Sequence, residues 1–208
     1  ELSLDVVPVR NKNMDWTVRF NFNHMWSSVL ALPDAIAYEY YIADTWLYGN
    51  ARGGLIRGGS TGTITGYGYA RNTRGDILIN PTTGIPVIDA NFLVRGDRTP
   101  AFTLGTNNII RYKNWNLSFL WDLKVGGDIY NATEQYLTSV GKSARTGNRL
   151  VPRVIKGVLN DGLQNSANPT VNTISITPYY AQTYYTSMPE EEFIQKNVNW
   201  LRLRDVTL

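Results

Sequence analysis

The 208-residue chain contains no cysteine, which excludes disulfide bridges, thiolate metal sites and a cysteine nucleophile. Charged residues are scarce at 18%, compared with about a quarter in an average soluble domain. The net charge of +3 comes from basic residues that are scattered along the chain without a cluster. Because nucleic-acid-binding surfaces gather basic residues in a patch or stripe, we expect no nucleic-acid partner. No apolar run reaches the roughly twenty residues that a membrane helix needs.

The sequence also lacks the residue groups on which catalytic and metal sites depend. It has one histidine, His24, which therefore has no second histidine or cysteine for a metal site and no defensible catalytic triad. Glu190, Glu191 and Glu192 supply carboxylates, but three adjacent residues at the start of a short helix favour the helix dipole over glycoside chemistry. The glycine-rich residues 53–62 lack the Gly-Lys-Ser/Thr ending of a phosphate loop. We predict no catalytic residue, cofactor or metal site, and that the chain is not an enzyme.

Aromatic residues are abundant, with 13 Tyr and 6 Trp, and favour strands over helices. Four segments alternate between two sets of side chains, as a strand does when successive residues point to opposite faces. These segments span residues 1–10, 15–23, 101–112 and 115–125. Short polar turns join them in pairs, so the sequence predicts two long antiparallel hairpins side by side in a curved, open sheet. A final strand is expected near residues 198–208, where Trp200 and Leu201 break the alternation and leave its phase open.

One set of side chains in these strands is apolar and aromatic, and the other is polar. A lipid-facing Arg or Lys near the middle of a bilayer costs roughly 2–4 kcal/mol, so in a membrane barrel the polar set would face the water-filled interior. The residues predicted to face this lumen are Arg19, Asn21, Asn116, Asp122 and Lys124. Arg111 is assigned to the same face, although it shares its phase with the apolar Ile109. The same alternation also fits a soluble β-sandwich, whose apolar faces form a core.

The connections at the other ends of the hairpins, residues 30–100 and 126–197, are about seventy residues each. Loops longer than about 15 residues are uncommon in compact domains, whereas outer-membrane barrels combine short periplasmic turns with long extracellular loops. The second connection predicts a helix at residues 132–140, which begins with a capping box of Asn131 and Glu134 and stops at Gly141. A second short helix is expected from Ser187 onward, and a small hairpin around residues 72–75.

Several segments occur in an order that resembles the late barrel strands of SusC/RagA-family TonB-linked outer-membrane proteins. They are residues 1–10, residues 16–23, Gly66-Tyr67-Gly68-Tyr69, Arg71-Asn72, Gly75-Asp76-Ile77-Leu78, Gly84-Ile85-Pro86, Tyr112-Lys113-Asn114, residues 126–131 and Leu201-Arg202-Leu203-Arg204. The resemblance implies a many-stranded barrel with an internal plug in a bacterial outer membrane of Bacteroidetes-like type. It also implies TonB-driven import of oligosaccharides, or in some members peptides, together with a SusD-like surface lipoprotein.

We therefore predict an all-β fold: an antiparallel transmembrane β-barrel segment, an open curved sheet in isolation, in contact with membrane lipid. Its long extracellular loops contain short helices. The chain starts at Glu1 without a signal segment and stops at Leu208 within an alternating run, so residues 1–208 are expected to be part of a longer receptor. The plug, the N-terminal region and the C-terminal closing strand would lie outside it.

Aromatic residues of the long loops are the candidates for substrate binding, because their rings can stack on sugars; the alternative for most of these rings is packing among the loops. The residues chosen are Trp46, Tyr48, Tyr179 and Tyr184. Two other functions remain open on the sequence alone, a soluble β-sandwich carbohydrate-binding module and a siderophore receptor of related architecture.

Overall fold

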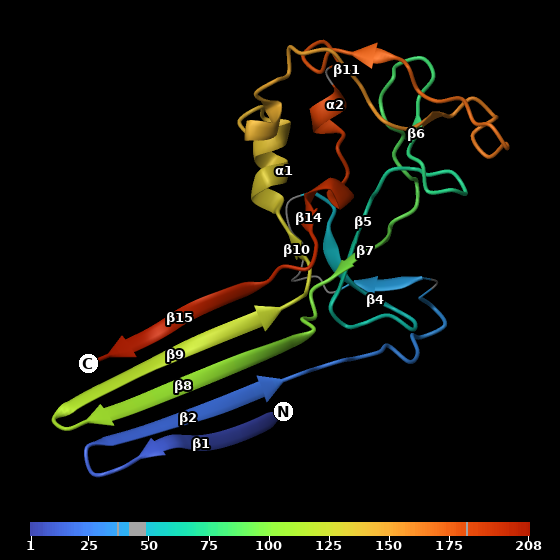
Figure 1. Ribbon diagram of the computed structural model, residues 1–208. Helices are drawn as coiled ribbons and strands as arrows, with labels where there is room; N and C mark the ends of the chain where they lie inside the picture. The colour runs from blue at the N-terminus through green and yellow to red at the C-terminus, as the bar shows by residue number, and fades with distance from the viewer. Residues whose placement is uncertain (37, 42–48, 182) are drawn as a thin grey trace.

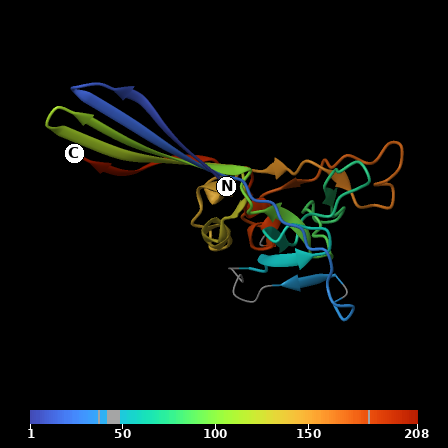
Figure 2. The same ribbon diagram turned by 90° about the horizontal axis from the view of Figure 1, so that it is seen from below.

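The structure is a computed structural model that describes residues 1–36, 38–41, 49–181 and 183–208. A long five-stranded sheet projects as an arm from a body of loops, short strands and short helices (Figures 1 and 2). We call this second part the loop body; it comprises the described residues of 24–101 and 126–199. None of the helices in the described ranges is long and apolar enough to cross a membrane.

The long sheet has the strand order β1-β2-β8-β9-β15, and every neighbouring pair is antiparallel. Its strands are β1 (Leu2–Arg10), β2 (Met14–Asn23), β8 (Phe102–Tyr112), β9 (Trp115–Val125) and β15 (Trp200–Thr207). The predicted pair of hairpins and the final strand are therefore confirmed. The sheet is open, because β1 and β15 each have one unpaired edge.

The pairing register divides the side chains of this sheet between two faces, since directly opposite residues of an antiparallel pair lie on the same face. Arg19 of β2 lies opposite Asn107 of β8, and Gly105 of β8 lies opposite Asp122 of β9. The polar residues of these three strands therefore lie on the same face of the sheet. The polar face carries Ser3, Asp5, Asp15, Thr17, Arg19, Asn21, Thr103, Gly105, Asn107, Ile109, Arg111, Asn116, Ser118, Leu120, Asp122, Lys124, Trp200, Arg202, Asp205 and Thr207. The five residues predicted to face a lumen therefore share one face, and Arg111 joins them between Asp15 and Asn116.

The apolar face carries the large hydrophobic and aromatic side chains of the sheet. They are Leu2, Leu4, Val6, Val9, Trp16, Val18, Phe20, Phe22, Phe102, Leu104, Ile110, Tyr112, Trp115, Leu117, Phe119, Trp121, Leu123, Val125, Leu201, Leu203 and Val206, with the polar Thr106 and Asn108 among them. Leu2 and Leu201 are 64% and 61% exposed. The open face means that, over the described residues, the long sheet is not one layer of a β-sandwich.

Local features of the chain explain the two departures from regular pairing. Pro8 has no N–H to donate to a neighbouring strand, and the β1–β2 register shifts between Val6 and Val9. In β15 the register shifts between Leu203 and Asp205, so Arg204 is the extra residue of a bulge. The break in the alternation at Trp200 and Leu201 has a different cause, because the pairing there is regular and the aromatic Trp200 lies on the polar face. The register now fixes the phase of β15, with Trp200 on the polar face and Leu201 on the apolar face.

The loop body contains a four-stranded antiparallel sheet of order β3-β4-β5-β7. Its strands are β3 (Glu39–Tyr41), β4 (Arg52–Ile56), β5 (Thr63–Gly66) and β7 (Leu93–Asp97). Three two-stranded pairs accompany it: β6 (Leu78–Ile79) with β12 (Val158–Leu159), β10 (Ile129–Tyr130) with β14 (Ile194–Gln195), and β11 (Arg153–Val154) with β13 (Ser175–Ile176). A small core of Ala51, Ile64, Tyr130, Phe193 and Ile194 joins segments from both long connections.

The helices of the loop body are short: α1 (Ala132–Ser139), the 3-10 helix η2 (Ala144–Thr146), α2 (Thr183–Thr186) and the 3-10 helix η3 (Glu190–Phe193). α1 is the helix predicted at residues 132–140, and the Asn131 side chain accepts a bond from the Glu134 backbone N–H at 3.0 Å. The second half of the predicted capping box is absent, because the Asn131 N–H donates to the Phe193 carbonyl. Gly141 has the positive φ of +72° expected of a helix stop.

Two local predictions for the loop body need correction. The helix expected from Ser187 starts at Glu190 with Pro189 as its N-cap, because the Ser187 hydroxyl donates to the Thr183 carbonyl and closes α2 instead. The hairpin around residues 72–75 forms at its turn, where the Asn72 N–H donates to the Asp76 carbonyl at 3.0 Å. The residues beside the turn also pair, because Arg71 and Ile77 form an antiparallel bridge and the Leu78 N–H donates to the Ala70 carbonyl at 2.8 Å. Further from the turn the local pairing ends, and residues 63–66 form β5, which pairs with β4 and β7.

Candidate functional site

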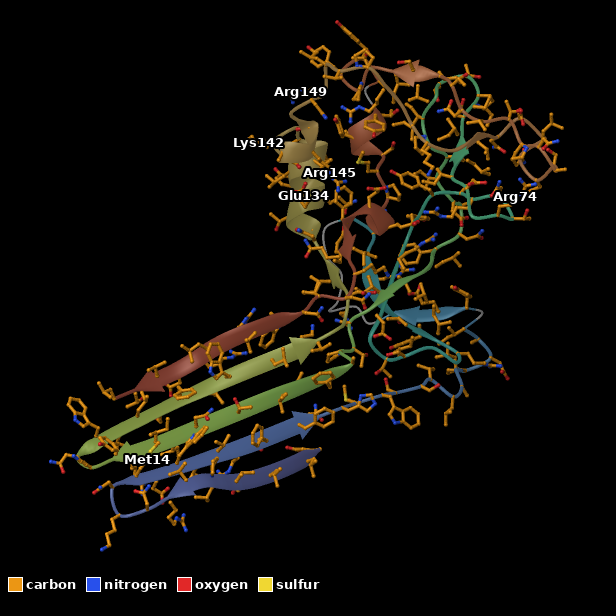
Figure 3. All side chains as sticks on the ribbon, in the orientation of Figure 1. Met14, Arg74, Glu134, Lys142, Arg145 and Arg149 are labelled. Atoms are coloured by element: carbon orange, nitrogen blue, oxygen red, sulfur yellow. The ribbon has the colours of Figure 1, made fainter. Side chains whose placement is uncertain are left out.

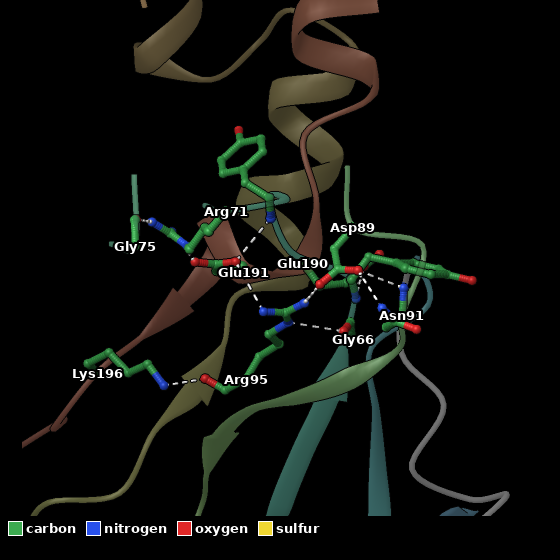
Figure 4. Close-up of polar contacts among 11 residues, drawn as sticks. Gly66, Arg71, Gly75, Asp89, Asn91, Arg95, Glu190, Glu191 and Lys196 are labelled. Atoms are coloured by element: carbon green, nitrogen blue, oxygen red, sulfur yellow. Dashed lines mark hydrogen bonds and ion pairs between the residues drawn. The ribbon is translucent and has the colours of Figure 1, made fainter. Parts of the chain in front are cut away.

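The three consecutive glutamates of η3 contact other segments of the loop body, as Figure 4 shows for Glu191. Glu190 is 3% exposed, and its two carboxylate oxygens accept the backbone N–H groups of Asn50 at 3.1 Å and Tyr67 at 3.0 Å. Both donors belong to the first long connection, so this carboxylate holds the two connections together. The expectation that the triplet serves mainly the helix dipole is therefore wrong for Glu190.

The neighbouring glutamates bind other parts of the loop body. Glu191 accepts from the Arg71 guanidinium at 2.6 Å and from the Tyr69 N–H at 3.1 Å. A second guanidinium, that of Arg95, lies 3.5 Å from Glu191 (Figure 4). Glu192 pairs with Arg145 at 3.4 Å. Each carboxylate thus has its own partner, and the triplet connects loops.

Asp128 lies at the base of the loop body, just beyond the end of β9. Its carboxylate accepts from the Asp97 N–H at 3.0 Å, the Asn197 N–H at 3.0 Å and the Lys196 ammonium at 2.9 Å. Burial acts to raise the pKa of Asp128, but the hydrogen bonds from Lys196, Asp97 and Asn197 outweigh it and hold the pKa below its ordinary value. Asp128 therefore joins the end of β7, the start of β10 and the segment that leads into β15.

A cavity of about 300 Å³ lies beside this junction. It is lined by Arg52, Gly53, Ile64, Arg98, Lys124, Asp128, Ile129 and Tyr130. Lys124 belongs to the polar face of β9, whereas the other lining residues belong to the loop body. The cavity therefore lies where the polar face of the long sheet meets the loop body.

The charges around this cavity do not balance. Arg52 pairs with Glu39 at 3.0 Å, and Asp128 pairs with Lys196. Arg98 donates to the Gly62 carbonyl at 3.4 Å, and neither Arg98 nor Lys124 forms an ion pair with a carboxylate of the described residues. Among the residues that the structure describes, the positive charges of Arg98 and Lys124 therefore have no ion-pair partner.

Trp200 is a neighbour of the cavity residue Lys124 that the sequence did not reveal. It lies opposite Lys124 in the β9–β15 pair, so both side chains are on the polar face. The guanidinium carbon of Arg202 lies 4.3 Å from the centre of the Trp200 ring, and that of Arg204 lies 5.6 Å from it. Counting back in steps of two from Leu203 and Leu201 would have placed Trp200 on the polar face. The sequence analysis had instead left the phase of this strand open.

Of the predicted substrate-binding residues, Tyr179 and Tyr184 do not line this cavity. Trp46 and Tyr48 lie outside the described residues. Tyr179 is 57% exposed, and its ring packs edge-on against Tyr180 at 5.2 Å. Tyr184 lies in α2, where burial raises the pKa of its hydroxyl. That these tyrosines bind substrate stays a prediction.

The predicted lumen-facing residues are linked by polar contacts across the strands. Arg19 pairs with Asp5 at 2.8 Å, and Asp122 pairs with Arg204 at 2.7 Å. The Ser3 hydroxyl donates to the Asn21 side chain at 2.9 Å. No group of three or more His, Asp or Glu side chains that could hold a metal ion occurs within the described ranges.

Comparisons with known proteins give one informative similarity. No protein-family model matches the chain. The chain is 28% identical over 152 residues to TonB-dependent receptor P3 of Formosa agariphila. The match covers 64% of this chain and 15% of the length of that receptor. This similarity supports a relationship to TonB-dependent receptors, and the antiparallel, strand-rich structure is consistent with a fragment of such a receptor's β-barrel.

Proposed function

We propose that this chain is part of the barrel of a TonB-dependent importer in a bacterial outer membrane. The observation that carries the proposal is the division of the long sheet into a polar and an apolar face, with turns at one end and the loop body at the other (Figure 1). Barrel strands of this class alternate between lipid and a polar interior, and connect through short turns on one side and long loops on the other.

The dimensions of the strands support a membrane-spanning role. A transmembrane strand needs about 9–11 residues. β8 and β9 have 11 residues each, β2 has 10 and β1 has 9. These strands have the lengths needed to cross the hydrocarbon layer once each.

Aromatic side chains lie near both ends of the apolar face. Trp16, Tyr112 and Trp115 lie beside the turns, and Phe22 and Phe102 stack at 5.5 Å near the loop body. Barrels of this kind have aromatic girdles at both membrane interfaces. We therefore assign the apolar face to lipid and the polar face to the lumen.

The proposed substrates are oligosaccharides, or peptides as a second class, received from a SusD-like lipoprotein on the cell surface. The resemblance of the strand segments to SusC/RagA proteins supports this choice, as do the exposed tyrosines of the loop body. Energy would come from the TonB system, through parts of the receptor that this chain does not contain. As in the relative, of which the match covers 15%, most of such a receptor would lie outside these residues.

The test is uptake by the cell that carries the complete gene. Fluorescently labelled oligosaccharides, peptides and ferric siderophores are supplied to the parent strain, to a strain without this gene and to a strain without TonB. We expect oligosaccharide uptake to fall to background in both mutants, and a lipoprotein to copurify with the receptor in detergent. Gene-dependent uptake of a siderophore alone would replace the proposed substrate. A receptor found in the soluble fraction would overturn the membrane assignment.

A further inference from the structure

We infer that the cavity between Lys124 and Arg98 receives the acidic group of the imported molecule, so that the substrate is an oligosaccharide bearing carboxylate or sulfate groups. This inference rests on the proposed function, because it assigns a substrate class to the same lumen. The acidic group is inferred from the position and charge of the residues that line the cavity.

The electrostatics of the cavity favour an anion. Arg52 and Asp128 are each engaged with an opposite charge, at 3.0 Å and 2.9 Å. Arg98 and Lys124 have no such carboxylate among the described residues, and they approach the cavity from different elements, the loop body and β9. A ligand carboxylate or sulfate would provide the missing negative charge, with stronger hydrogen bonds than a neutral hydroxyl makes.

The walls of the cavity would strengthen this attraction. Ile64 and Tyr130 are buried and belong to the small core of the loop body, and Ile129 adds a further apolar surface. Apolar surroundings lower the local dielectric, so a charge pair interacts more strongly there than on an open surface. The cavity thus combines a partly apolar wall with two cations.

The neighbouring strand adds a surface for the sugar ring. Trp200 lies opposite Lys124 on the polar face, and Arg202 lies over its indole. Aromatic rings stack on the apolar faces of sugars, while Lys and Arg recognise acidic substituents. Because Arg202 covers one face of the indole, a sugar would stack on the other face, and an acidic group on that sugar would meet the positive charge of Lys124 or Arg202. In an acidic sugar the ring face and the acidic group belong to one residue, whereas the acidic side chains of a peptide, Asp and Glu, have no ring, so the arrangement favours the glycan.

The experiment measures binding to the complete receptor, purified from outer membranes in detergent. The probes are oligosaccharides of galacturonate and sulfated oligosaccharides of galactose, each beside its neutral form made by carboxyl reduction or desulfation. We expect one acidic probe to bind at least about tenfold more tightly than its neutral form, which corresponds to about 1.4 kcal/mol. The two acidic probes distinguish a carboxylate from a sulfate as the recognised group. Affinity for the acidic probe should fall as salt is raised.

The variants Lys124→Gln and Arg98→Gln test the residues. Each substitution should lower the affinity for the acidic probe about tenfold, because a charge-assisted bond is lost, and should leave the affinity for the neutral probe unchanged. The variant with both substitutions should bind the acidic probe and its neutral form with the same affinity. Lys124→Arg keeps the charge and should keep the preference. Lys142→Gln removes an exposed charge at the far end of α1 and should change nothing (Figure 3).

Three results would overturn the inference. They are equal binding of acidic and neutral probes, no binding of any acidic probe, and unchanged affinity for the acidic probe in the double variant. The failure of the proposed function looks different, because it is the absence of gene-dependent oligosaccharide uptake. A receptor that imports a neutral oligosaccharide would retain the proposed function and lose only this inference.

Discussion

The long sheet and the loop body are stabilised in different ways. In the long sheet, long regular ladders satisfy the backbone, and large apolar residues such as Leu2 and Leu201 stay exposed. In the loop body, strands are short, and buried side chains complete the hydrogen bonding of the backbone. Glu190 is the clearest case, since it accepts two N–H groups from the other long connection. The sheet therefore depends on its surroundings to cover its apolar face, and the loop body on its own polar contacts.

The long sheet and the loop body satisfy the hydrogen bonding of their backbones in different ways. Nearly every buried backbone N–H and C=O needs a partner. Regular strands meet this need without side chains, which leaves the side chains of the sheet available for the lipid and lumen contacts proposed above. The loop body has irregular backbone, and side chains such as Asn72 and Asn80 accept the N–H groups of their turns. Substitutions at these side chains should therefore cost more than polar substitutions in the sheet.

The largest expected effect is at Glu190. Replacement by Ala leaves the N–H groups of Asn50 and Tyr67 without their acceptor, and bonds to a charged group are worth about 1.5–3 kcal/mol each. We expect Glu190→Ala to destabilise the loop body by roughly 3–5 kcal/mol. The measurement is amide hydrogen exchange of the receptor in detergent, with faster exchange in both long connections and little change in the long sheet.

The triplet provides its own controls. Glu192 pairs with Arg145 at 3.4 Å near the surface, so Glu192→Ala should cost under about 1 kcal/mol. Figure 3 places Arg145 beside α1. Glu190→Gln keeps one acceptor oxygen and should fall between the two alanine variants. Equal effects at Glu190 and Glu192 would show that the buried carboxylate has no special role.

The second prediction compares the two faces of β8 at mid-strand. Thr106 lies on the apolar face and Asn107 on the polar face. Thr106→Arg places a charge in lipid near the bilayer centre and should cost roughly 2–4 kcal/mol. Asn107→Arg places the same charge in the lumen beside Arg19, where like-charge repulsion costs under about 1 kcal/mol. The readout is folding in lipid vesicles. A larger loss of folding with Asn107→Arg than with Thr106→Arg would reverse the assignment of the faces.

The sequence predicts the long sheet well because its signal is local. Alternation with a period of two shows each strand, and short polar turns show which strands pair. The loop body depends on contacts that no local pattern contains. Glu190 and Tyr67 are 123 positions apart, and Lys124 and Trp200 become neighbours only through the β9–β15 register. The cavity could therefore not be predicted, although the lumen-facing set that includes Lys124 could be assigned to one face.

The third prediction concerns the junction between the two regions. The pKa of Asp128 is lower in the folded chain than its ordinary value, so this carboxylate stabilises the fold above the unfolded pKa of about 3.9. That contribution is lost as the pH falls below this value and passes through the folded pKa. Asp128→Asn removes the ion pair with Lys196 and should destabilise the junction by about 1–2 kcal/mol at neutral pH.

The readout for Asp128 is proteolysis near residues 97, 128 and 197. At neutral pH the Asp128→Asn variant should be cut faster than the parent. With pepsin, the difference should shrink as the pH is lowered from 4 toward 2, because the parent also loses its charge. A constant difference over this range would mean that the charge of Asp128 does not hold the junction.

The smallest expected effect is at Tyr179, on the exposed surface of the loop body. The backbone N–H of Tyr179 donates to the Arg149 carbonyl at 2.9 Å, and alanine keeps this bond. Its ring is exposed and contacts the neighbouring Tyr180, so its removal should not disturb the core. If the ring stacks on a sugar, Tyr179→Ala should weaken oligosaccharide uptake by the equivalent of about 1 kcal/mol, with receptor abundance unchanged.

Tyr184→Ala is a less direct test because that ring is half-buried in α2, so lower abundance would accompany any loss of uptake. Normal uptake by Tyr179→Ala at normal abundance would leave this ring as packing against Tyr180. Substrate recognition would then depend on the polar face and its cavity, where Arg98 and Lys124 lie.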